Sequence, residues 1–586
     1  MVSASAQRTH QIEMVRPTTT ILPRAVNFFI PAVVILLLAA PALFTKAGFV
    51  DDWVNHLWLT WMQSREIKAT GHPSLFLNAS PLGVFYPNFA FYGGTLYAIG
   101  GYLMVATGSP VTVFVGIIVL AFVAAYGGTF WIARQAGVGG LTAHLPATIV
   151  VTGAYYLSDA YGRGSWPEFV ATSAIPLVLA SGLRIVRRGP SPGSILLLAG
   201  STTIWSGSHN LTFAWGTAFL VAIGVCLLLA WDTQLVERHI RRIGVVLGVM
   251  GLGVMINGWF LLPDLAYSLH TQIAQYRTID PAISGIFSRF SVVFNPLRER
   301  ATDSTYLRSH FTELPVLVIL WLIVAVAMLQ VRTWTRSMRR LVLLLAGVLV
   351  GFIVLLLDEQ VWHKLPSVLS VIQFTFRLEA YIVMTVAGLT IVLLRAMRDH
   401  DRRMRRSGLV ILLTTAVLFG LGLATWQVWN SNAWYYPYSP KYLANRSSVL
   451  HYPYQTPPTW YETGQFRDVS DQVVPTEGEV QLDPAEVKGE STTQNVTIPV
   501  GEGPLSSNIA ASANLVSVSG LRIAGRTASG FLALDRPEND SHIVRLTVSR
   551  ANTTPMTLGP LLTLLGALGL AGSILTSFIF RRRRRH

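Results

Sequence analysis

The chain has 586 residues, of which 51% are hydrophobic and only 13% are charged. A soluble protein of this length would carry roughly twice that charged fraction, and the chain repeats apolar runs long enough to cross a hydrocarbon core of about 30 Å, so the class is a polytopic α-helical membrane protein. The net charge of +15 does not indicate a nucleic-acid partner, because the arginines cluster in short loops between apolar runs, as the positive-inside bias predicts.

The apolar runs and the arginine groups together predict about twelve membrane spans. If each arginine group lies in the cytoplasm, an even number of crossings must separate neighbouring groups. This condition places both chain ends in the cytoplasm and predicts a multi-pass protein of the cell membrane. The spans are expected to begin near Ala25, Pro110, Thr142, Pro167, Gly193, Leu211, Ile243, Glu313, Leu341, Glu379, Gly408 and Thr557.

The composition divides the chain into four regions. A cytoplasmic N-terminus at 1–24 precedes a transmembrane domain at 25–429, whose first outer loop covers 45–109. An exported β-rich domain is expected at 430–555, where apolar runs disappear and the alternating stretches LVSVSGLRIAG and HIVRLTVSR are typical of half-buried strands. We expect this region to form a small β-sandwich or jelly roll. A last transmembrane helix and an arginine-rich cytoplasmic tail take up 556–586.

Two helices are predicted in the first outer loop. Trp53, Leu57, Trp58 and Trp61 recur at helical spacing, with polar Asn55, Gln63 and Arg65 between them. This pattern predicts an amphipathic helix lying in the outer interface. The aromatic and glycine-rich segment 85–108 predicts a second helix at or dipping into the same interface, with its tyrosines and phenylalanines at the headgroup level.

The first of these helices begins with two adjacent carboxylates, Asp51 and Asp52. Asp52 and His56 are four residues apart and share one helix face, and both aspartates stand where the helix dipole favours negative charge. A carboxylate in this position can take a proton from a sugar hydroxyl as a general base. The alternative is a helix N-cap, which explains one aspartate without any function.

Further polar residues stand at the outer ends of later spans, where a charge avoids the cost of about 2.5–3.5 kcal/mol at the bilayer centre. Arg163 can fork onto a phosphate or pair with Asp159 and Glu168 to order a loop. His209 can contact substrate or make a helix-packing hydrogen bond. Arg377 runs against the positive-inside bias, which favours a phosphate ligand over snorkelling. The candidates for substrate binding are His56, Asp159, Arg163, Glu168, His209, Asn210, Gln373 and Arg377.

The sequence predicts no cofactor. It contains no H-E-x-x-H, C-x-x-C or D-x-D pattern, and two adjacent aspartates point in different directions, so metal-independent chemistry is favoured and a divalent metal is the alternative. The only cysteine, Cys226, excludes a disulfide within the chain. The single cysteine, the excess of arginine over lysine and the many Ala, Val and Gly residues indicate a bacterium with GC-rich DNA.

The ordered motifs of the first 92 residues carry a resemblance. An N-terminal span is followed by the D-x-x-x-H pair Asp52 and His56, by G-H-P at 71–73, and by Gly83, Tyr86, Pro87, Phe91 and Tyr92 before an interfacial helix. This order resembles the integral-membrane glycosyltransferases of the GT-C superfamily. Within it, the chain looks closest to the bacterial membrane proteins called YfhO-like or 6-pyruvoyl-tetrahydropterin-synthase-related, with the similarity running over 25–429.

The resemblance implies transfer of a sugar from a polyprenyl-phosphate-linked donor. The acceptor would be a cell-envelope glycan or lipid on the extracytoplasmic side, and the reaction would invert the anomeric carbon. The catalytic base of the first outer loop maps onto Asp52, with Asp51 as the competing position, and Arg377 would meet the donor phosphate. Partners are thus the lipid-linked donor, the acceptor and membrane lipid. Two other readings remain: a transporter or flippase for a lipid-linked glycan, and a non-catalytic scaffold for envelope assembly.

Overall fold

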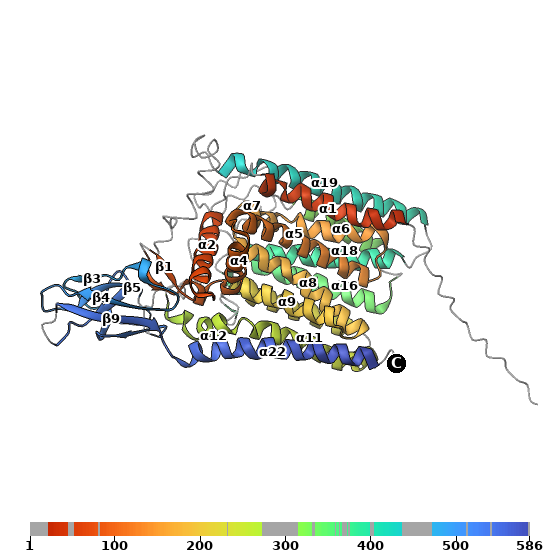
Figure 1. Cartoon of the computed structure of the whole chain (residues 1–586). Helices are drawn as coiled ribbons and strands as arrows, with labels where there is room; N and C mark the ends of the chain where they lie inside the picture. Colours follow the sequence, from red (N-terminus) through yellow and green to blue (C-terminus); the bar gives the residue numbers. More distant parts are fainter. Residues whose placement is uncertain are drawn as a thin grey trace, which may run out of the picture.

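The computed structural model describes residues 21–44, 52–79, 82–230, 233–271, 314–330, 334–357, 359–362, 364–365, 372, 375–398, 403–435, 472–510, 512, 514–538 and 542–583. Most described helices run side by side in one elongated bundle (Figure 1). Eight of them are long and apolar enough to cross a membrane. They are α1 (Ile21–Phe44), α5 (Pro110–Gln135), α8 (Trp166–Arg188), α10 (Asn210–Ala230), α16 (Arg336–Leu357), α18 (Glu379–Arg398), α19 (Arg403–Tyr435) and α22 (Thr554–Arg583). The predicted polytopic helical membrane fold is confirmed.

The other four expected spans correspond to shorter or bent helices. Helices α11 (Thr233–Met255) and α12 (Gly258–Tyr267) are bent by 79° against each other and make a ninth span if they are counted together. Asn257 lies buried at the bend, where its amide donates to the carbonyl of Thr203 at 2.8 Å and to Ser206 Oγ at 2.7 Å. The remaining three are η1 (Gly140–Ala143) with α6 (His144–Val151), α9 (Pro192–Ser208) and α15 (Leu314–Gln330).

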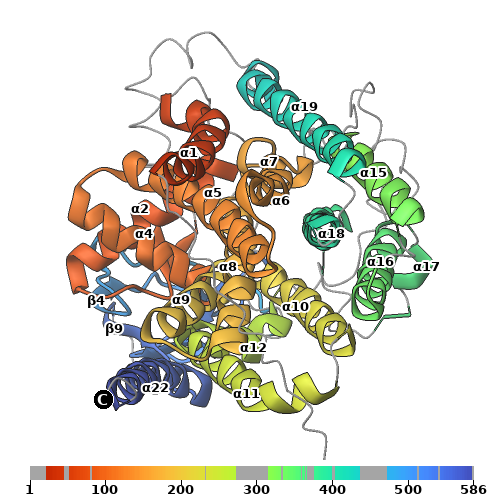
Figure 2. The same ribbon diagram turned by 90° about the vertical axis from the view of Figure 1, so that its right-hand side faces the viewer.

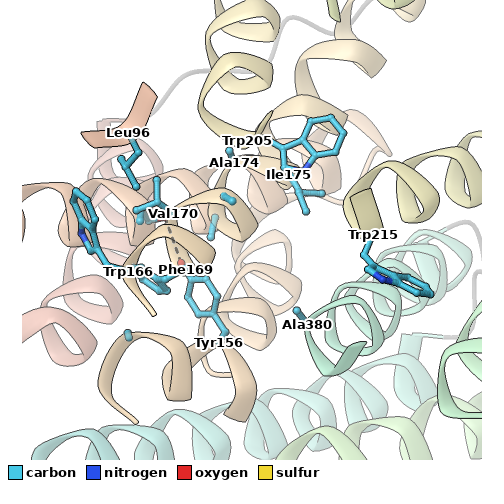
Figure 3. Close-up of a cluster of buried hydrophobic side chains, with 14 of the residues drawn as sticks. Leu96, Tyr156, Trp166, Phe169, Val170, Ala174, Ile175, Trp205, Trp215 and Ala380 are labelled. Carbon is cyan, nitrogen blue, oxygen red and sulfur yellow. Dashed lines mark hydrogen bonds between the residues drawn. The ribbon is translucent and has the colours of Figure 1, made fainter. Parts of the chain in front are cut away.

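Helix α8 lies at the centre of the bundle (Figure 2). In its apolar window 78% of the residues are buried, against 11% in α22 at the edge. Figure 3 shows aromatic and aliphatic side chains of α8, among them Trp166 and Phe169, packed among side chains of other helices, such as Trp205 of α9 and Trp215 of α10. Because close packing of this kind resists displacement, the first turn of α8 is a fixed platform for the polar residues around it.

Two helices of the first outer loop, α2 (Asp52–Thr70) and α4 (Gly94–Thr107), cross one end of the bundle (Figure 1). They are more buried than interfacial helices. Gln63, expected on a polar face, is fully buried and exchanges two hydrogen bonds with the backbone of Ser74, at 2.6 Å and 3.1 Å. Tyr97 is fully buried too. Gln63 and Tyr97 therefore pack inside the protein, whereas Tyr102 of α4 is 46% exposed, and the depth of the two helices in the membrane stays a prediction.

The C-terminal β-rich region, which composition predicted, contains two sheets. One has the strand order β1-β2-β5-β8-β7, with β3 also paired to β5, and the other has the order β4-β9-β6. The predicted alternating stretches form β6, β7 and β9. The strands of this region, which we call the β domain, are β3 (Glu479–Val480), β4 (Ser491–Thr497), β5 (Leu505–Ala510), β6 (Val516–Ser519), β7 (Ile523–Arg526), β8 (Phe531–Leu534) and β9 (Ile543–Arg550).

The remaining two strands, β1 (Leu77–Ala79) and β2 (Gly83–Tyr86), come from the first outer loop and were not predicted. Val84 of β2 pairs in parallel with Ile509 of β5. The first outer loop and the β domain are thus joined in one sheet. The short elements elsewhere are α3 (Asn88–Phe91), α7 (Ala154–Tyr161), η2 (Ser268–His270), α17 (Glu359–Trp362), η6 (Thr375–Leu378) and η8 (Pro484–Glu486).

Exposed or half-buried arginines from several helices gather at one end of the bundle. We call the end that meets the β domain the β end and the opposite end, where α22 finishes, the basic end (Figure 1). At the basic end Arg242 donates to the carbonyls of Val186 and Arg187. Arg187 lies within electrostatic range of Arg188 and Arg395. Arginines from α8, α11 and α18 therefore gather at this end.

Candidate functional site

The candidate site lies at the β end, where α2 begins. Asp52, the first residue of α2, is half-buried, and its backbone N–H donates to the carbonyl oxygen of Arg163 at 3.1 Å. The first N–H groups of a helix have no partner inside the helix, so the Arg163 carbonyl satisfies one of them and fixes where α2 starts. The helix dipole favours negative charge at this position. The competing candidate Asp51 lies outside the described residues.

Arg163 also organises a buried group of charges, which we call the arginine cluster: Asp159, Arg163, Glu168 and Arg377, with Tyr155. Arg163 lies in the turn between α7 and α8. Its Nη1 is 3.5 Å from Asp159 Oδ1 and 3.3 Å from Glu168 Oε2, and it donates to the Tyr155 hydroxyl at 3.0 Å. The Tyr155 hydroxyl in turn donates to Glu168 Oε1 at 2.7 Å. The predicted trio around Arg163 is therefore brought together.

Arg377 reaches the same cluster from η6, more than 200 residues further along the chain. Its Nε is 3.3 Å from Glu168 Oε2, and its Nη1 donates to the carbonyl of Ile372 at 3.2 Å. One carboxylate oxygen of Glu168 thus faces both guanidinium groups and holds them side by side. Gln373, expected beside Arg377, lies outside the described residues.

Asp159 carries the second carboxyl group of the arginine cluster and is completely buried. Burial raises the pKa of Asp159 well above its usual range, and the carboxylate of Glu168 adds to the effect, whereas Arg163 and Arg377 oppose it. A raised pKa favours the neutral, protonated carboxyl. Two guanidinium groups thus face one carboxylate oxygen of Glu168.

A second, uncharged group lies beside it, which we call the imidazole–tyrosine group: His56, Tyr92, Tyr97 and His209. His56 Nδ1 and the Tyr97 hydroxyl are hydrogen-bonded at 2.7 Å. The Tyr92 ring stacks on His56 with centroids 6.1 Å apart and meets the His209 ring edge-on at 5.8 Å. Burial lowers the pKa of His56 to about 3, with further contributions from His209 and Arg163. His56 is therefore neutral at physiological pH, and its buried Nε2 has no hydrogen-bond partner within the described part of the chain.

Tyr92 lies close to both Asp52 of the first outer loop and Arg377 of η6. Burial raises the pKa of the Tyr92 hydroxyl, the carboxylate of Asp52 acts in the same direction, and the guanidinium of Arg377 opposes it. Both groups therefore lie within electrostatic range of one phenol. The early carboxylate and the late arginine, which are 325 positions apart by their numbers (377 − 52), belong to one neighbourhood.

No family model and no curated protein matches the sequence. Among solved structures, the chain is similar in part to the arabinofuranosyltransferase AftD from mycobacteria. The match has a TM-score of 0.39 and 16% sequence identity, and it covers 70% of this chain and 28% of that one. This chain therefore spans well under half the length of AftD, and the activity in that name describes AftD alone.

Asn210 has a different surrounding from that expected of a substrate ligand. Its side-chain amide nitrogen donates to the carbonyl of Phe91 and to Asp264 Oδ2, both at 2.8 Å. These bonds tie the start of α10 to α3 and α12. Next to it, His209 Nδ1 is hydrogen-bonded to Thr212 Oγ1 at 2.8 Å. The amide nitrogen of Asn210 thus makes structural hydrogen bonds within the protein. Its Oδ1 is buried without a hydrogen-bond partner among the described residues.

The described residues contain no group of three or more His, Cys, Asp or Glu side chains that could hold a metal ion. In the arginine cluster the carboxylates face guanidinium groups, and the two imidazoles of the imidazole–tyrosine group are separated by the ring of Tyr92. The arrangement suits an anion and a hydroxyl-bearing molecule, since it offers positive charge on one side and neutral hydrogen-bonding groups on the other.

Sequence reasoning did not select Tyr92, Tyr97 or Tyr155 as site residues. Each is an aromatic residue near a span end, where tyrosine is common for reasons of membrane anchoring alone. They are distinguished by their neighbours, because all three contact a charged or imidazole side chain. Only the folded chain brings these side chains together.

Proposed function

We propose that this chain is a membrane glycosyltransferase of the GT-C superfamily that uses a polyprenyl-phosphate-linked sugar as donor. The observation that carries the proposal is that a half-buried carboxylate, Asp52, lies in the same neighbourhood as two buried guanidinium groups, which are held on one carboxylate oxygen of Glu168. The polyprenyl phosphate that leaves needs positive charge nearby, and an acceptor hydroxyl needs a base. The acceptor would be a cell-envelope glycan or lipid, and the closer likeness to the YfhO-like group stays a prediction.

In this proposal the arginine cluster binds the donor phosphate. Arg163 and Arg377 both face one carboxylate oxygen of Glu168, and the raised pKa of Asp159 acts toward an excess of positive charge in the cluster. Arg163 and Arg377 are fixed by Glu168 before the donor arrives, so little reorganisation is needed when the phosphate takes up negative charge during transfer. Arginine is suited to this role because its planar fork matches phosphate oxygens.

The imidazole–tyrosine group would hold the sugar. His56 is neutral, so it contributes a hydrogen bond and no charge. The half-buried ring of Tyr92 offers an apolar face between the two imidazoles against which a sugar ring can pack. This division assigns the phosphate to the charged group and the hydroxyls to the neutral one.

The reaction step follows from these assignments. The carboxylate of Asp52 takes the proton of an acceptor hydroxyl as its oxygen forms a bond to the anomeric carbon. The bond from that carbon to the phosphate oxygen breaks, and its electron pair leaves with the polyprenyl phosphate. Attack opposite the leaving group inverts the anomeric carbon. No metal takes part in the proposed step.

The proposed orientation puts the β end outside and the basic end in the cytoplasm, in agreement with the positive-inside bias. Arg187, Arg242 and Arg395 lie at the basic end. The donor would then be used in the outer leaflet, and the chain ends would lie in the cytoplasm.

The test is transfer by purified protein presented with a panel of polyprenyl-phosphate sugars and envelope glycans. Wild-type protein should release free polyprenyl phosphate, and Asp52→Asn should lower the rate by about 10²–10⁴-fold while donor binding persists. Glu486→Gln, on the exposed surface of the β domain, is the matched control and should behave as wild type. Unchanged turnover in Asp52→Asn would refute Asp52 as the base.

A lipid-linked-glycan transporter is the second candidate, because the bent pair α11–α12 is a feature that transporters share. Reconstituted vesicles separate the two. A transporter moves the intact donor across the bilayer without releasing free lipid phosphate, whereas the proposed enzyme releases it. Neither release nor movement would be expected of a scaffold.

A further inference from the structure

Helix α2 is held at both ends by different parts of the chain. Its first residue, Asp52, is bonded to Arg163 of the bundle. Near its other end, Glu66 is buried, and its Oε2 accepts a hydrogen bond from the backbone N–H of Gly489 in the β domain at 3.0 Å. The two partners of this bond are 423 positions apart, so the contact belongs to the docking of the β domain and not to the helix itself.

A second carboxylate repeats the contact in the opposite direction. Glu490 of the β domain accepts from the backbone N–H of Leu75, just after α2, at 3.1 Å, and it is also paired with Arg550 at 3.1 Å. Gly489 and Glu490 are neighbours, so two adjacent residues of the β domain bind the end of α2 and the segment that follows it. The pairing of β2 with β5 continues the same contact.

The buried position of the Glu66 carboxylate costs free energy of folding. Burial raises the pKa of Glu66, and Glu490 adds to this, while the bond from Gly489, the side chain of Asn78 and the charge of Arg65 oppose it. Burying a carboxylate costs free energy of folding unless hydrogen bonds or charges compensate for the water that it loses. Here the bond that is obtained joins the β domain to the helix that carries the proposed base.

Helix geometry makes that joint relevant to Asp52. Glu66 lies 14 residues after Asp52 on the same uninterrupted helix, a distance of about 21 Å along its axis. A helix of this length moves largely as one piece, so a shift at Glu66 is passed to Asp52 and His56. A displacement of about 1 Å at a catalytic group can cost about 100-fold in rate.

We propose that Glu66 is a positioning residue: by binding the backbone of Gly489 it clamps α2 between the β domain and the bundle and so sets where Asp52 and His56 stand in the site. The inference rests on the proposed function for its catalytic part. The β domain is then a structural component of the site as well as an appended domain.

The experiment compares Glu66→Ala and Glu66→Gln in the full-length protein in detergent. Alanine removes the acceptor, whereas the glutamine oxygen can still accept from Gly489. Glu486→Ala removes an exposed carboxylate of the β domain and serves as the control. Three quantities are measured on each variant: the hydrogen–deuterium exchange rate of the α2 backbone, and kcat and donor KM in the transfer assay.

Glu66→Ala should speed exchange in α2 by about tenfold or more, since a buried hydrogen bond to a charged group stabilises by about 1.5–3 kcal/mol. It should lower kcat by about tenfold or more and change donor KM much less than kcat, because the arginine cluster proposed to bind the donor phosphate lies on other elements. Glu66→Gln should restore both. A variant that was merely misfolded would lose donor binding together with kcat.

Each contrary result overturns a different statement. Unaltered α2 exchange in Glu66→Ala overturns the clamp, whether or not the protein transfers sugar. Faster exchange with normal kcat overturns the positioning role. If Glu66→Gln shows the same fast α2 exchange and low kcat as Glu66→Ala, the hydrogen bond to Gly489 is not the cause of the positioning. If wild type is inactive on every donor, the proposed function fails, and the exchange measurement still decides the clamp.

Discussion

The backbone N–H of Asp52 donates to the carbonyl oxygen of Arg163 at 3.1 Å, while the guanidinium of the same arginine lies 3.3 Å from Glu168 Oε2. One residue therefore sets both the start of the helix that bears the proposed base and the arrangement of the proposed phosphate site. Base and phosphate site are coupled through a single turn of chain. Glu168, which holds the second arginine as well, is the residue on which this coupling depends.

Glu168→Gln should destabilise the protein strongly. Removal of the buried carboxylate leaves Arg163 and Arg377 without their shared counter-charge, and breaking a buried pair in this way costs about 3–5 kcal/mol. The midpoint of thermal unfolding in detergent measures the loss. Glu479→Gln, on the exposed edge of the β domain, should leave the midpoint near that of wild type. Equal midpoints for the two variants would contradict the arginine cluster as described.

The charged part of the site could be predicted from sequence because charge is rare in a membrane chain. Arg163, Glu168 and Arg377 stand out at the ends of apolar runs, where a charge without a purpose is selected against by its desolvation cost. Their grouping on one carboxylate oxygen could not be predicted, since it depends on how η6 meets α8.

The aromatic part and the docking of the β domain could not be predicted. Tyr92 and Tyr97 have the same residue type as ordinary interfacial anchors. The pairing of Val84 with Ile509 joins strands more than 400 residues apart, and no periodicity within either strand encodes its partner. Gln63 was assigned to a polar face because the pattern cannot show that the backbone of Ser74 satisfies it.

Tyr97→Phe should weaken the site without disturbing the bundle. The hydroxyl of Tyr97 is bonded to His56 Nδ1 at 2.7 Å, and His56 Nε2 has no hydrogen-bond partner in the described chain. Loss of the hydroxyl leaves a buried ring nitrogen unsatisfied, at a cost of about 1–3 kcal/mol, and frees the imidazole to rotate. Thermal unfolding and sugar transfer should both decline.

Tyr102→Phe is the matched control for that change. Tyr102 lies on the same helix, is 46% exposed, and donates to the carbonyl of Gly71 at 3.2 Å. Water can replace this bond, so the variant should keep wild-type stability and turnover. A decline as large as that of Tyr97→Phe would show that hydroxyl loss anywhere on α4 has the same effect.

Gly83→Ala should separate the first outer loop from the β domain. Gly83 has φ +81°, and a Cβ at this position would lie 2.1 Å from the carbonyl oxygen of Asn508, so strand β2 must move away from β5. Gly71 has nearly the same φ, +83°, with nothing within 4 Å of its Cβ. Gly71→Ala should therefore cost only the backbone strain, about 1–2 kcal/mol. Hydrogen exchange in β5 should rise in Gly83→Ala and stay normal in Gly71→Ala, and a rise in both would point to strain alone.

The orientation of the molecule can be tested with single cysteines, because Cys226 is the only native cysteine and is buried. Ser519 lies exposed in the β domain and Arg188 lies exposed at the basic end. A membrane-impermeant maleimide applied to intact cells should label Ser519→Cys at once and Arg188→Cys only after the membrane is permeabilised, while wild type stays unlabelled in both conditions. The opposite pattern would put the arginine cluster and Asp52 on the cytoplasmic side, where an outer-leaflet donor cannot reach them.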